Sequence, residues 1–547
     1  MPVAPPQQTR PRLHWALARR GCIGAPILRH SDCNAGRATH TVEGLPTRRI
    51  LSLSLCLLAI VPQACQRDLA VGPAGSAAAG AAPNGTPTRL SFVTRSLASG
   101  EANVAISPPL QVAVQDSLGN TVPGRADTVT LALAANPSEA SLLGTTTLSM
   151  IDGMATFRDL RVDRPGSGYT LAATRAGLAD ATSAPFAMHV TFASVDGGYV
   201  HTCGVTTSGA AYCWGDNYSG QLGEETAPSA WYRASPAPVA RAELKFTTIS
   251  TGVWHTCGVT PSGAAYCWGD NFFGQLGDGT SVARATPVPV DGGLRFATVS
   301  AGSFHTCGIT PSGAAYCWGD NQNAQLGDGT TDRRATPVPV AGGFRFIAIS
   351  AGHAHTCGVT PQGVAVCWGD DSSGQLGDGD ASADQASYRP YPAAVVGVRG
   401  FARVSAGNVH TCGVTTRGTA YCWGYNIWGQ LGDGTTTQRS RPVRVTGGLR
   451  FAAVDAGSYF SCGLTGSGAA YCWGENRDGE LGDGTTTSRS SPIAVAGGLR
   501  FAAVKAGWYH VCGMKTDRGA YCWGYNAHGQ LGEGTTVSGP TPVRVVQ

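Results

Sequence analysis

The sequence predicts an all-β protein in which one unit of about fifty residues is repeated seven times. The second cysteine of each unit recurs at intervals of 50 to 55 residues between Cys213 and Cys522. The 547 residues include 76 glycines and 32 prolines, and only 14% are charged, which is typical of short strands joined by tight turns. A fixed period near fifty residues indicates a repeat architecture, so the repeat decides the fold class.

Charge and cysteine content narrow the function classes. The formal net charge is +4, and so near-neutral a balance does not favour nucleic acid as the main partner. Eighteen cysteines would be unusual in a reducing cytosol, and fourteen of them occur two per repeat at one spacing. This regularity predicts local disulfides in an oxidising compartment and hence an exported protein.

Residues 1–65 are predicted to be a leader. An apolar run at residues 50–64 has the length of a signal-peptide core and is too short to span a bilayer comfortably. The Ala64-Cys65 pair resembles the lipobox of bacterial lipoproteins, although Pro62 stands where that pattern usually has leucine. The resemblance implies lipidation at Cys65, which would be the chain's contact with a membrane. Plain signal cleavage is the alternative.

The position of this run also bears on where translation begins. A signal core rarely starts fifty residues into a chain, so we expect a start at Val42, with a short segment ending in Arg48-Arg49 before the apolar run. After the leader, residues 66–87 are rich in Ala, Gly and Pro. They cannot bury a core and are predicted to form a flexible tether.

A first folded module is predicted at residues 88–191. Apolar and β-branched runs are separated there by turn residues, which predicts an antiparallel β-sandwich. The expected strands span 90–94, 110–115, 129–134, 155–162, 169–174 and 186–190. Segments 112–122, 153–157 and 168–171 resemble bacterial immunoglobulin-like domains. That resemblance implies an immunoglobulin-like β-sandwich that serves as a spacer or adhesion module.

Residues 192–547 hold the seven repeats, each predicted to contain four strands. In the second repeat these strands, named A to D, span 246–250, 255–260, 264–268 and 287–290. Four antiparallel strands per unit, seven units and no helix predict a seven-bladed β-propeller. A single such sheet would leave both faces in water, so neighbouring units must stack to form a core.

One motif identifies a family for these repeats. Residues 267–280 read Cys-Trp-Gly-Asp-Asn-x-x-Gly-Gln-Leu-Gly-Asp-Gly-Thr, and close versions start at Cys213, Cys317, Cys367, Cys422, Cys472 and Cys522. The motif strongly resembles the regulator of chromosome condensation repeat family, which implies a seven-bladed propeller. The departures include Ala324 for a glycine, Glu480 for a glutamine, and Tyr425 and Tyr525 for an aspartate.

The ends of the repeat domain suggest how the ring closes. The domain opens on an A strand at residues 192–196 and ends on a D strand at residues 541–546. If the sequence repeat is offset from the blade, the last strand completes the first blade and fastens the ring. We state this offset closure as a hypothesis.

The repeated cysteines have the geometry of a cross-strand pair. Cys257 and Cys267 lie symmetrically about Ser262, so they face one another across the B–C hairpin. In a non-hydrogen-bonded pair the Cα atoms are about 4.5 Å apart, just within disulfide range. Seven intrablade disulfides are predicted, with reduced buried thiols as the alternative. The pairs are Cys203–Cys213, Cys257–Cys267, Cys307–Cys317, Cys357–Cys367, Cys412–Cys422, Cys462–Cys472 and Cys512–Cys522.

Other repeated polar residues are interpreted as structural. His255 shares a strand face with Cys257, but only three zinc ligands would be present, and the sixth repeat has Phe460 in the histidine position. We therefore expect no metal or cofactor. Trp268 and its equivalents are predicted to pack blade against blade. Asp278 and its equivalents could bind cations, but solvated turns are the preferred interpretation.

The A–B and C–D connections must emerge on one face of the ring, because the strands alternate in direction. Two dipeptides vary between repeats on this face, and many of them hold large apolar side chains suited to a protein-binding hot spot. The candidate partner-binding residues are Tyr199, Tyr218, Trp254, Phe272, Phe273, Phe304, Ile427, Trp428, Tyr459, Trp508, Tyr509 and His528. The alternative is that several of these side chains tuck under neighbouring loops.

The B–C turns and D–A links emerge on the other face. Several of these links carry a basic residue just before a phenylalanine: Lys245, Arg295, Arg345, Arg450 and Arg500. This ring could bind an anion, but a solvated basic rim is the preferred interpretation.

Together these features predict an exported, lipid-anchored bacterial protein, monomeric and non-enzymatic, that binds a protein partner through a propeller face. In the family that the repeats resemble, an exported bacterial inhibitor of β-lactamases binds through such a face, which implies a mode of binding and no target. One alternative is nucleotide exchange on a small GTPase, which nuclear members perform; secretion and disulfides argue against it. Another is a propeller enzyme acting on cell wall or polysaccharide. No paired carboxylates, nucleophile motif or metal triad interrupts the repeats.

Overall fold

The computed structural model describes residues 85–94, 100–124, 126–224, 231–380 and 388–546. The predictions on the signal core, lipidation at Cys65 and a start at Val42 lie outside the described residues. Within them the chain is all-β except for one short 3-10 helix, η1 (Ala496–Gly498). None of the helices in these ranges is long and apolar enough to cross a membrane.

The first module contains two main sheets. The first sheet has the order β1 (Arg89–Phe92), β3 (Leu110–Gln115), β7 (Met154–Phe157). The second has the order β2 (Gly100–Glu101), β11 (Phe186–His189), β9 (Gly166–Thr174), β4 (Thr128–Ala135), β6 (Thr147–Ser149), with β10 (Ala181–Thr182) beside β9. A separate pair joins β5 (Leu142–Leu143) to β8 (Arg161–Val162).

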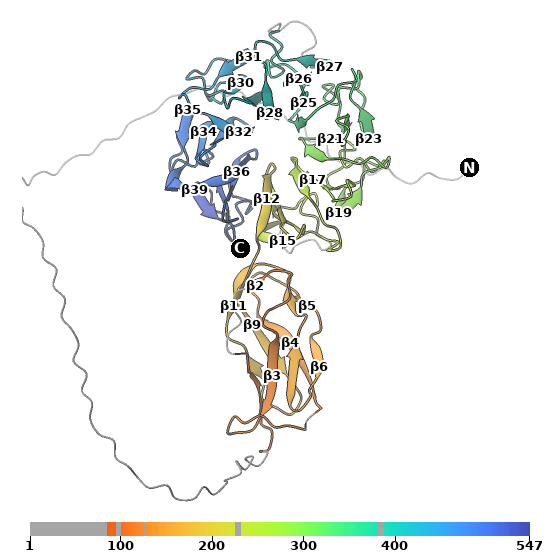
Figure 1. Cartoon of the computed structure of the whole chain (residues 1–547), viewed down its shortest axis with the longest axis vertical. Helices are drawn as coiled ribbons and strands as arrows, with labels where there is room; N and C mark the ends of the chain where they lie inside the picture. Colours follow the sequence, from red (N-terminus) through yellow and green to blue (C-terminus); the bar gives the residue numbers. More distant parts are fainter. Residues whose placement is uncertain (1–84, 95–99, 125, 225–230, 381–387, 547) are drawn as a thin grey trace, which may run out of the picture. The chain divides into compact units, whose positions relative to one another are not determined.

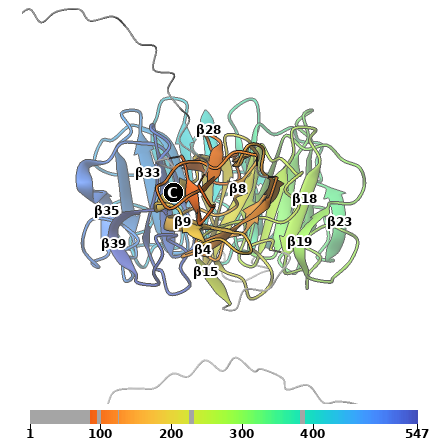
Figure 2. The same ribbon diagram turned by 90° about the horizontal axis from the view of Figure 1, so that it is seen from below.

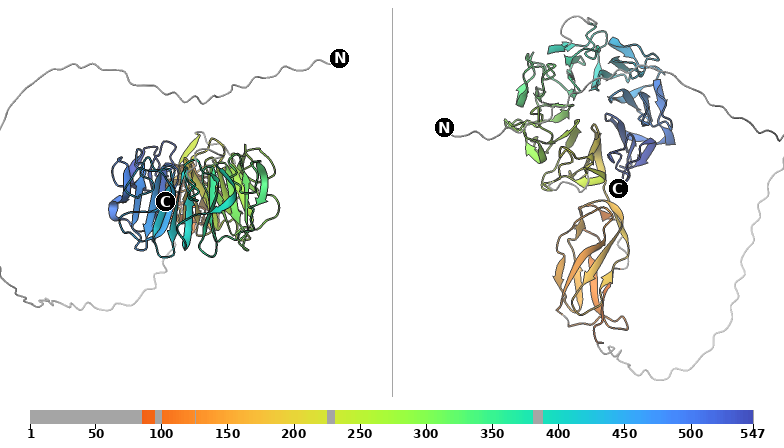
Figure 3. Two further views of the ribbon diagram at one scale, coloured as in Figure 1. Left: turned by 90° about the horizontal axis from the view of Figure 1, so that it is seen from above. Right: turned by 180° about the vertical axis from the view of Figure 1, so that it is seen from behind.

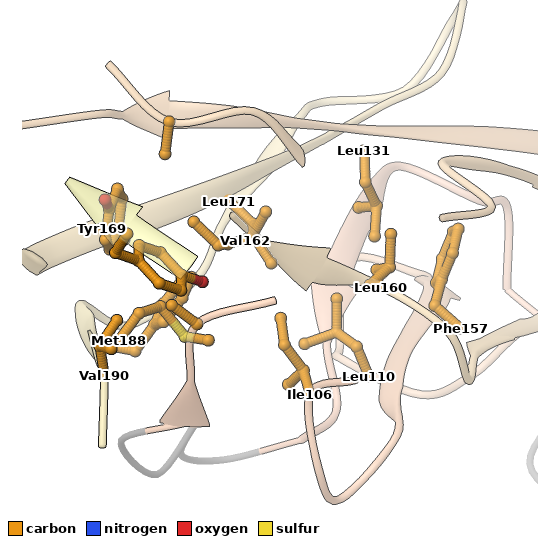
Figure 4. Close-up of a cluster of buried hydrophobic side chains, with 14 of the residues drawn as sticks. Ile106, Leu110, Leu131, Phe157, Leu160, Val162, Tyr169, Leu171, Met188 and Val190 are labelled. Carbon is orange, nitrogen blue, oxygen red and sulfur yellow. The ribbon is translucent and has the colours of Figure 1, made fainter. Parts of the chain in front are cut away.

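Alternate side chains of these strands form the core of the module, as expected for strands with one buried face. Leu110, Leu131, Phe157 and Leu171 are buried together (Figure 4). The hydroxyl of Tyr169 donates to the Arg164 carbonyl at 3.1 Å, a tyrosine-corner contact found in immunoglobulin-type sandwiches. The relationship to bacterial immunoglobulin-like domains stays a prediction.

The repeats form seven four-stranded antiparallel sheets arranged as a ring (Figures 1 and 3), seen edge-on in Figure 2. Blades 1 to 3 consist of β12 (Phe192–Gly197), β13 (His201–Thr206), β14 (Ala211–Asp216) and β15 (Tyr232–Pro238); β16 (Thr248–Thr251), β17 (His255–Val259), β18 (Ala265–Gly269) and β19 (Arg284–Pro289); and β20 (Thr298–Ala301), β21 (His305–Ile309), β22 (Ala315–Gly319) and β23 (Arg334–Pro339). Blades 4 and 5 consist of β24 (Ala348–Ala351), β25 (His355–Val359), β26 (Ala365–Asp370) and β27 (Tyr388–Ala394); and β28 (Phe401–Ala406), β29 (His410–Thr415), β30 (Ala420–Gly424) and β31 (Arg439–Arg444). Blades 6 and 7 consist of β32 (Phe451–Ala456), β33 (Phe460–Thr465), β34 (Ala470–Gly474) and β35 (Arg489–Ala494); and β36 (Phe501–Ala506), β37 (His510–Lys515), β38 (Ala520–Gly524) and β39 (Gly539–Arg544). The predicted seven-bladed propeller is confirmed, with the A strands innermost and the D strands outermost.

The hypothesis of offset closure is wrong. The first A strand, β12, belongs to blade 1 and the last D strand, β39, to blade 7, so each sequence repeat is one whole blade. Side-chain contacts close the seam between blades 7 and 1. His510 Nε2 lies 2.7 Å from Thr202 Oγ1, and Trp214 Nε1 donates to the Gln530 carbonyl at 2.9 Å. Every other junction uses the equivalent tryptophan contact, so closure needs no exchanged strand.

The tryptophan of each repeat packs one blade against the next, as predicted. Trp268 is fully buried in a cluster with Cys203 and Val205 of the preceding blade. Its Nε1 donates to the Gln221 carbonyl at 2.9 Å. The neighbouring glycine makes room for the ring: a Cβ on Gly277 would lie 2.7 Å from Trp318 Nε1. The repeated Gln-Leu-Gly sequence is therefore a socket for the next blade's tryptophan.

A second polar contact joins most blades. The buried His255 Nε2 lies 2.9 Å from Thr306 Oγ1 of the next blade. The Thr306 hydroxyl donates its own proton to the Gln275 carbonyl, so the imidazole Nε2–H is the donor to that hydroxyl. The equivalent histidines are His201, His305, His355, His410 and His510, each beside a threonine or serine hydroxyl. Blade 6 is the exception, because Phe460 and Val511 occupy these two positions in an apolar cluster.

The prediction of seven intrablade disulfides is confirmed. Cys257 pairs with Cys267 directly across the B–C hairpin, and all seven pairs have Cα atoms 4.1 Å apart. The cysteine side chains are 0 or 1% exposed. Each disulfide therefore joins the two middle strands of a blade inside the stack.

The repeated aspartates of the C–D loops are not solvated turns. The Asp278 side chain is only 8% exposed, and its two oxygens accept from Asn271, Thr280 and Arg284. Asn271 Oδ1 also accepts the Leu276 amide at 2.9 Å. Since the loop is long, it needs internal partners for its backbone, and this carboxylate with its asparagine supplies them. The loop bases are consequently fixed, while the variable dipeptide stands at the tip.

Replacing Asp371 with asparagine should stabilise the protein at pH 8. Asp371 occupies the asparagine position in blade 4, where burial, with the negative charge of Asp378, raises its pKa to about 7. Because this pKa lies above the unfolded value of about 3.9, ionisation destabilises the fold progressively as pH rises towards 7. After allowance for partial exposure, we expect Asp371→Asn to gain about 1–2 kcal/mol at pH 8 in urea unfolding, and less at pH 5.

The matched control is Asn271→Asp, which should lose stability at pH 8 for the same reason. Equal stability of wild type and Asp371→Asn at pH 8 would contradict this interpretation.

Candidate functional site

The A–B and C–D loops form one face, which we call the loop face. Within each blade the two loops touch: the Asp270 amide donates to the Trp254 carbonyl at 2.8 Å. Successive blades touch as well, since the rings of Phe273 and Phe304 lie 5.1 Å apart. The twelve predicted binding residues all lie in these loops, so the fold gathers them on one face of the ring.

Six side chains form an inner aromatic cluster around the propeller axis: Tyr199, Trp254, Phe304, His353, Trp508 and Tyr509. Tyr199 contacts Trp254 and Trp508, with centroids 6.5 and 5.5 Å apart. Trp254 contacts Phe304 at 5.8 Å. His353 lies 6.0 Å from Phe304 and 5.5 Å from Trp508, which completes the circuit. His353 belongs to blade 4 and Trp508 to blade 7, so the cluster extends across the axis.

Beneath the cluster a polar channel follows the axis. It encloses a cavity of about 100 Å³ lined by the A strands and by Trp508. Its side chains join adjacent blades: Ser250 Oγ accepts the Ala301 amide at 3.1 Å. At the seam, Lys505 Nζ lies 3.9 Å from Asp196 and 3.8 Å from Asp455. Asp455 is the main cause that raises the pKa of Lys505. These contacts hold the ring together under the aromatic cluster.

An outer set of apolar side chains surrounds the cluster on the C–D loops. Tyr218, Phe272 and Ile427 are 73, 67 and 56% exposed. Tyr218 stacks on Trp231, with ring centroids 5.3 Å apart. Arginines cover two further rings, because the guanidinium carbon of Arg333 lies 4.4 Å from the centroid of Phe273 and that of Arg477 lies 4.4 Å from the centroid of Trp428.

The alternative of tucked side chains holds for part of the predicted set. Trp254 is exposed like the outer residues. The others are half-buried, mostly against one another: Tyr199, Phe273, Phe304, Trp428, Tyr459, Trp508, Tyr509 and His528. Rings held by their neighbours lose little rotamer entropy when a partner binds, which suits a hot spot.

Sequence reasoning missed four members of this surface: Trp231, His353, Tyr425 and Tyr525. Tyr425 packs on Tyr459, and Tyr525 on Tyr509, both at 6.2 Å. The signal for these two tyrosines was present, because they replace the aspartate of the repeat motif. Only the three-dimensional structure shows Trp231 beside Tyr218.

Tyr509 and His353 of the inner aromatic cluster are neutral at pH 7. Burial, with Tyr199 as the next cause, raises the pKa of Tyr509 to about 12, and burial lowers the pKa of His353. Glu480 stands in blade 6 at the motif position that Gln275 holds in blade 2. In blade 2, Gln275 Nε2 donates to Asp270 at 2.7 Å. In blade 6, burial raises the pKa of Glu480 to about 7. Across the described ranges no group of three or more histidine, cysteine or acidic side chains is placed to hold a metal ion.

Fold and site together define a seven-bladed β-propeller of disulfide-bridged repeats with an aromatic loop face. The regulator of chromosome condensation (RCC1) repeat matches this chain in two forms. One form matches residues 208–259, 262–309, 312–359, 417–464, 467–514 and 519–547; the other matches residues 192–221, 246–275, 296–325, 346–375, 401–430, 451–480 and 501–530. Together the matches cover more than half of the chain, which belongs to the regulator of chromosome condensation (RCC1) repeat family.

Curated relatives resemble short stretches of the chain. The ultraviolet-B receptor UVR8 of Arabidopsis thaliana is 35% identical over 94 residues, which are 17% of this chain and 21% of the receptor. The probable E3 ubiquitin-protein ligase HERC4 of Homo sapiens is 34% identical over 91 residues, 16% of this chain and 8% of the ligase. The matched stretches thus span about a fifth or less of the length of these relatives.

Solved structures with the same fold include two of yeast RCC1. Prp20p of Saccharomyces cerevisiae, described with its binding to Gsp1p and histones, has a TM-score of 0.51 at 21% identity over 58% of this chain and 80% of its own. Yeast RCC1 (Prp20) bound to Kap60 has a TM-score of 0.56 at 20% identity, covering 65 and 85% of the two chains. Human WBSCR16 has a TM-score of 0.55 at 19% identity, covering 71 and 100%. At these identities the likeness shows the fold alone.

Proposed function

We propose that the protein is a non-enzymatic binding protein that holds a protein partner on the loop face. The inner aromatic cluster carries this proposal. Trp254, Phe304 and Trp508 present large apolar area in conformations already fixed by ring contacts. Rigid aromatic side chains near the centre of a surface, with polar groups around them, supply most of the binding energy in protein interfaces.

The cellular setting forms part of the same proposal. The fourteen cysteines of the seven disulfides support folding in an oxidising compartment. We therefore propose an exported, monomeric protein that Cys65 anchors through a lipid. Nucleotide exchange on a small GTPase is the less favoured candidate, because such a partner belongs to the reducing cytosol.

Removing four loop-face rings should abolish partner binding. The variant combines Trp254→Ala, Phe273→Ala, Trp428→Ala and Trp508→Ala. Since a hot-spot residue contributes about 2 kcal/mol or more, the combination should weaken binding by at least about a thousandfold. The partner is recovered by pull-down from surface-protein extracts, identified, and titrated against the purified variant by calorimetry.

The matched control is Phe344→Ala with Ile347→Ala, two exposed apolar residues on the opposite face. It should bind like wild type. If the four-ring variant keeps its thermal transition and still recovers every partner at wild-type affinity, the loop face is not the binding surface.

A further inference from the structure

The opposite face, which we call the turn face, consists of the B–C turns and the D–A links. Each link between consecutive blades carries a basic residue one or two positions before a phenylalanine. This phenylalanine begins the next A strand or lies just before it. These residues form the basic ring: Lys245, Arg295, Arg345, Arg399, Arg450 and Arg500, all of them exposed. The acidic residues in the same links are Glu243 and Asp291. The six links therefore carry a net positive charge.

The turns hold the charges of the basic ring in place. Arg450 Nη1 donates to the Arg417 carbonyl at 2.7 Å, and Arg500 Nη1 donates to Ser467 Oγ at 3.2 Å. Arg295 and Arg345 contact the equivalent carbonyls of Ser262 and Ser312. Each of these guanidiniums thus lies over the B–C turn of the preceding blade, from which its link comes.

The basic ring differs from the D strands of the propeller in how its charges are paired. The D-strand arginines Arg284, Arg334 and Arg439 form ion pairs with the aspartates of the C–D loops. In the ranges that the structure describes, no member of the basic ring forms such a pair. The charge of the turn face is therefore available to an external anion.

The links of the turn face are open to solvent. A Cβ added at Gly292, Gly293, Gly343, Gly448 or Gly498 would meet no atom within 4 Å, so these links present bare backbone to solvent. The B–C turns are tight, and exposed apolar side chains, Phe344 and Ile347, accompany the bases. A linear polyanion is best held by a groove that tracks it, whereas here single bases are distributed around a circle.

We propose that the turn face binds the anionic surface of a lipid bilayer. A planar array of headgroup phosphates complements a ring of bases on solvent-exposed links, whatever the rotation of the ring about its axis. Basic residues with a few apolar side chains are the combination that holds proteins at anionic interfaces. This contact is independent of the proposed partner binding, which uses the other face.

The test uses the full chain carrying Cys65→Ser, so that no lipid anchor contributes. Vesicles of phosphatidylcholine with about 30% phosphatidylglycerol should sediment the protein, and pure phosphatidylcholine vesicles should not. The variant Arg295→Gln, Arg345→Gln, Arg450→Gln and Arg500→Gln should bind at least about a hundredfold more weakly, about fivefold for each charge lost near the surface. Binding of the Cys65→Ser chain should also fall steeply as salt rises.

The charge-matched control replaces four exposed arginines outside the turn face: Arg89→Gln, Arg158→Gln, Arg161→Gln and Arg441→Gln. It should keep vesicle binding, and so should the four-ring variant of the loop face. Equal loss in both arginine variants would overturn the proposal, because net charge alone would then be responsible. So would binding to a soluble polyanion such as heparin without binding to anionic vesicles. Thermal transitions confirm that each variant is folded.

Discussion

Lowering the pH from 7 towards 3 should unfold the propeller cooperatively, with uptake of about six protons. Six histidines are buried between blades: His201, His255, His305, His355, His410 and His510. Burial lowers the pKa of each to about 3. An imidazole that donates through Nε2 and is cut off from water cannot accept a second proton without leaving its site.

The direction of the effect follows from the two pKa values of each histidine. The folded pKa of about 3 lies below the unfolded value of 6.5, so the unfolded state binds more protons between these limits. The contribution to stability is complete above pH 6.5 and is lost as pH falls towards 3. Each pH unit costs about 1.4 kcal/mol per histidine, or about 8 kcal/mol for six, against a typical stability of 5–15 kcal/mol. We expect a midpoint between about pH 6 and 4.

Blade 6 provides the matched design for this test. The double variant His255→Phe with Thr306→Val copies the Phe460–Val511 contact into blade 2. It should remain folded, unfold at lower pH and take up one proton fewer. Circular dichroism at stepped pH measures the pH of unfolding. The pH dependence of urea unfolding measures the number of protons taken up. A wild-type transition with fewer than two protons taken up would contradict the assignment of these histidines.

Complete reduction of the disulfides should unfold the propeller at neutral pH. Each disulfide joins two cysteines that are ten residues apart in the sequence. In the chain-entropy model such a link contributes about 3 kcal/mol to the free energy of unfolding. Seven links exceed the total stability of an ordinary domain. The chain is reduced in denaturant and then returned to native buffer that contains a reductant. We expect the thermal transition to be lost after this treatment. Thiol titration should confirm fourteen free repeat cysteines.

A single-blade variant separates the local effect from the total. Cys257→Ala with Cys267→Ala should lower stability by about 3 kcal/mol and leave the other six links formed. Native-like melting of the fully reduced chain would show that stacking alone holds the blades.

The pairing of residues close together in the chain could be predicted from the sequence. Cys257 and Cys267 lie symmetrically about their turn, and hairpin register depends only on the turn and its flanking residues. The period of the repeat likewise fixed the number of blades, because each unit is one sheet that needs neighbours. These are contacts between residues close together in the chain, where spacing is sufficient evidence.

Contacts between blades were decided by the tertiary structure. The hypothesis that the last strand completes the first blade is wrong. The ring closes between whole blades, with His510 against Thr202 at a separation of 308 residues. Asp278 proved to be a buried anchor of its loop, which spacing alone does not distinguish from a solvated turn. The sequence determined which residues vary on the loop face, whereas only the curvature of seven stacked sheets decided that His353 and Trp508 meet across the axis. A linear pattern carries no information on how far a stack of sheets turns before it closes.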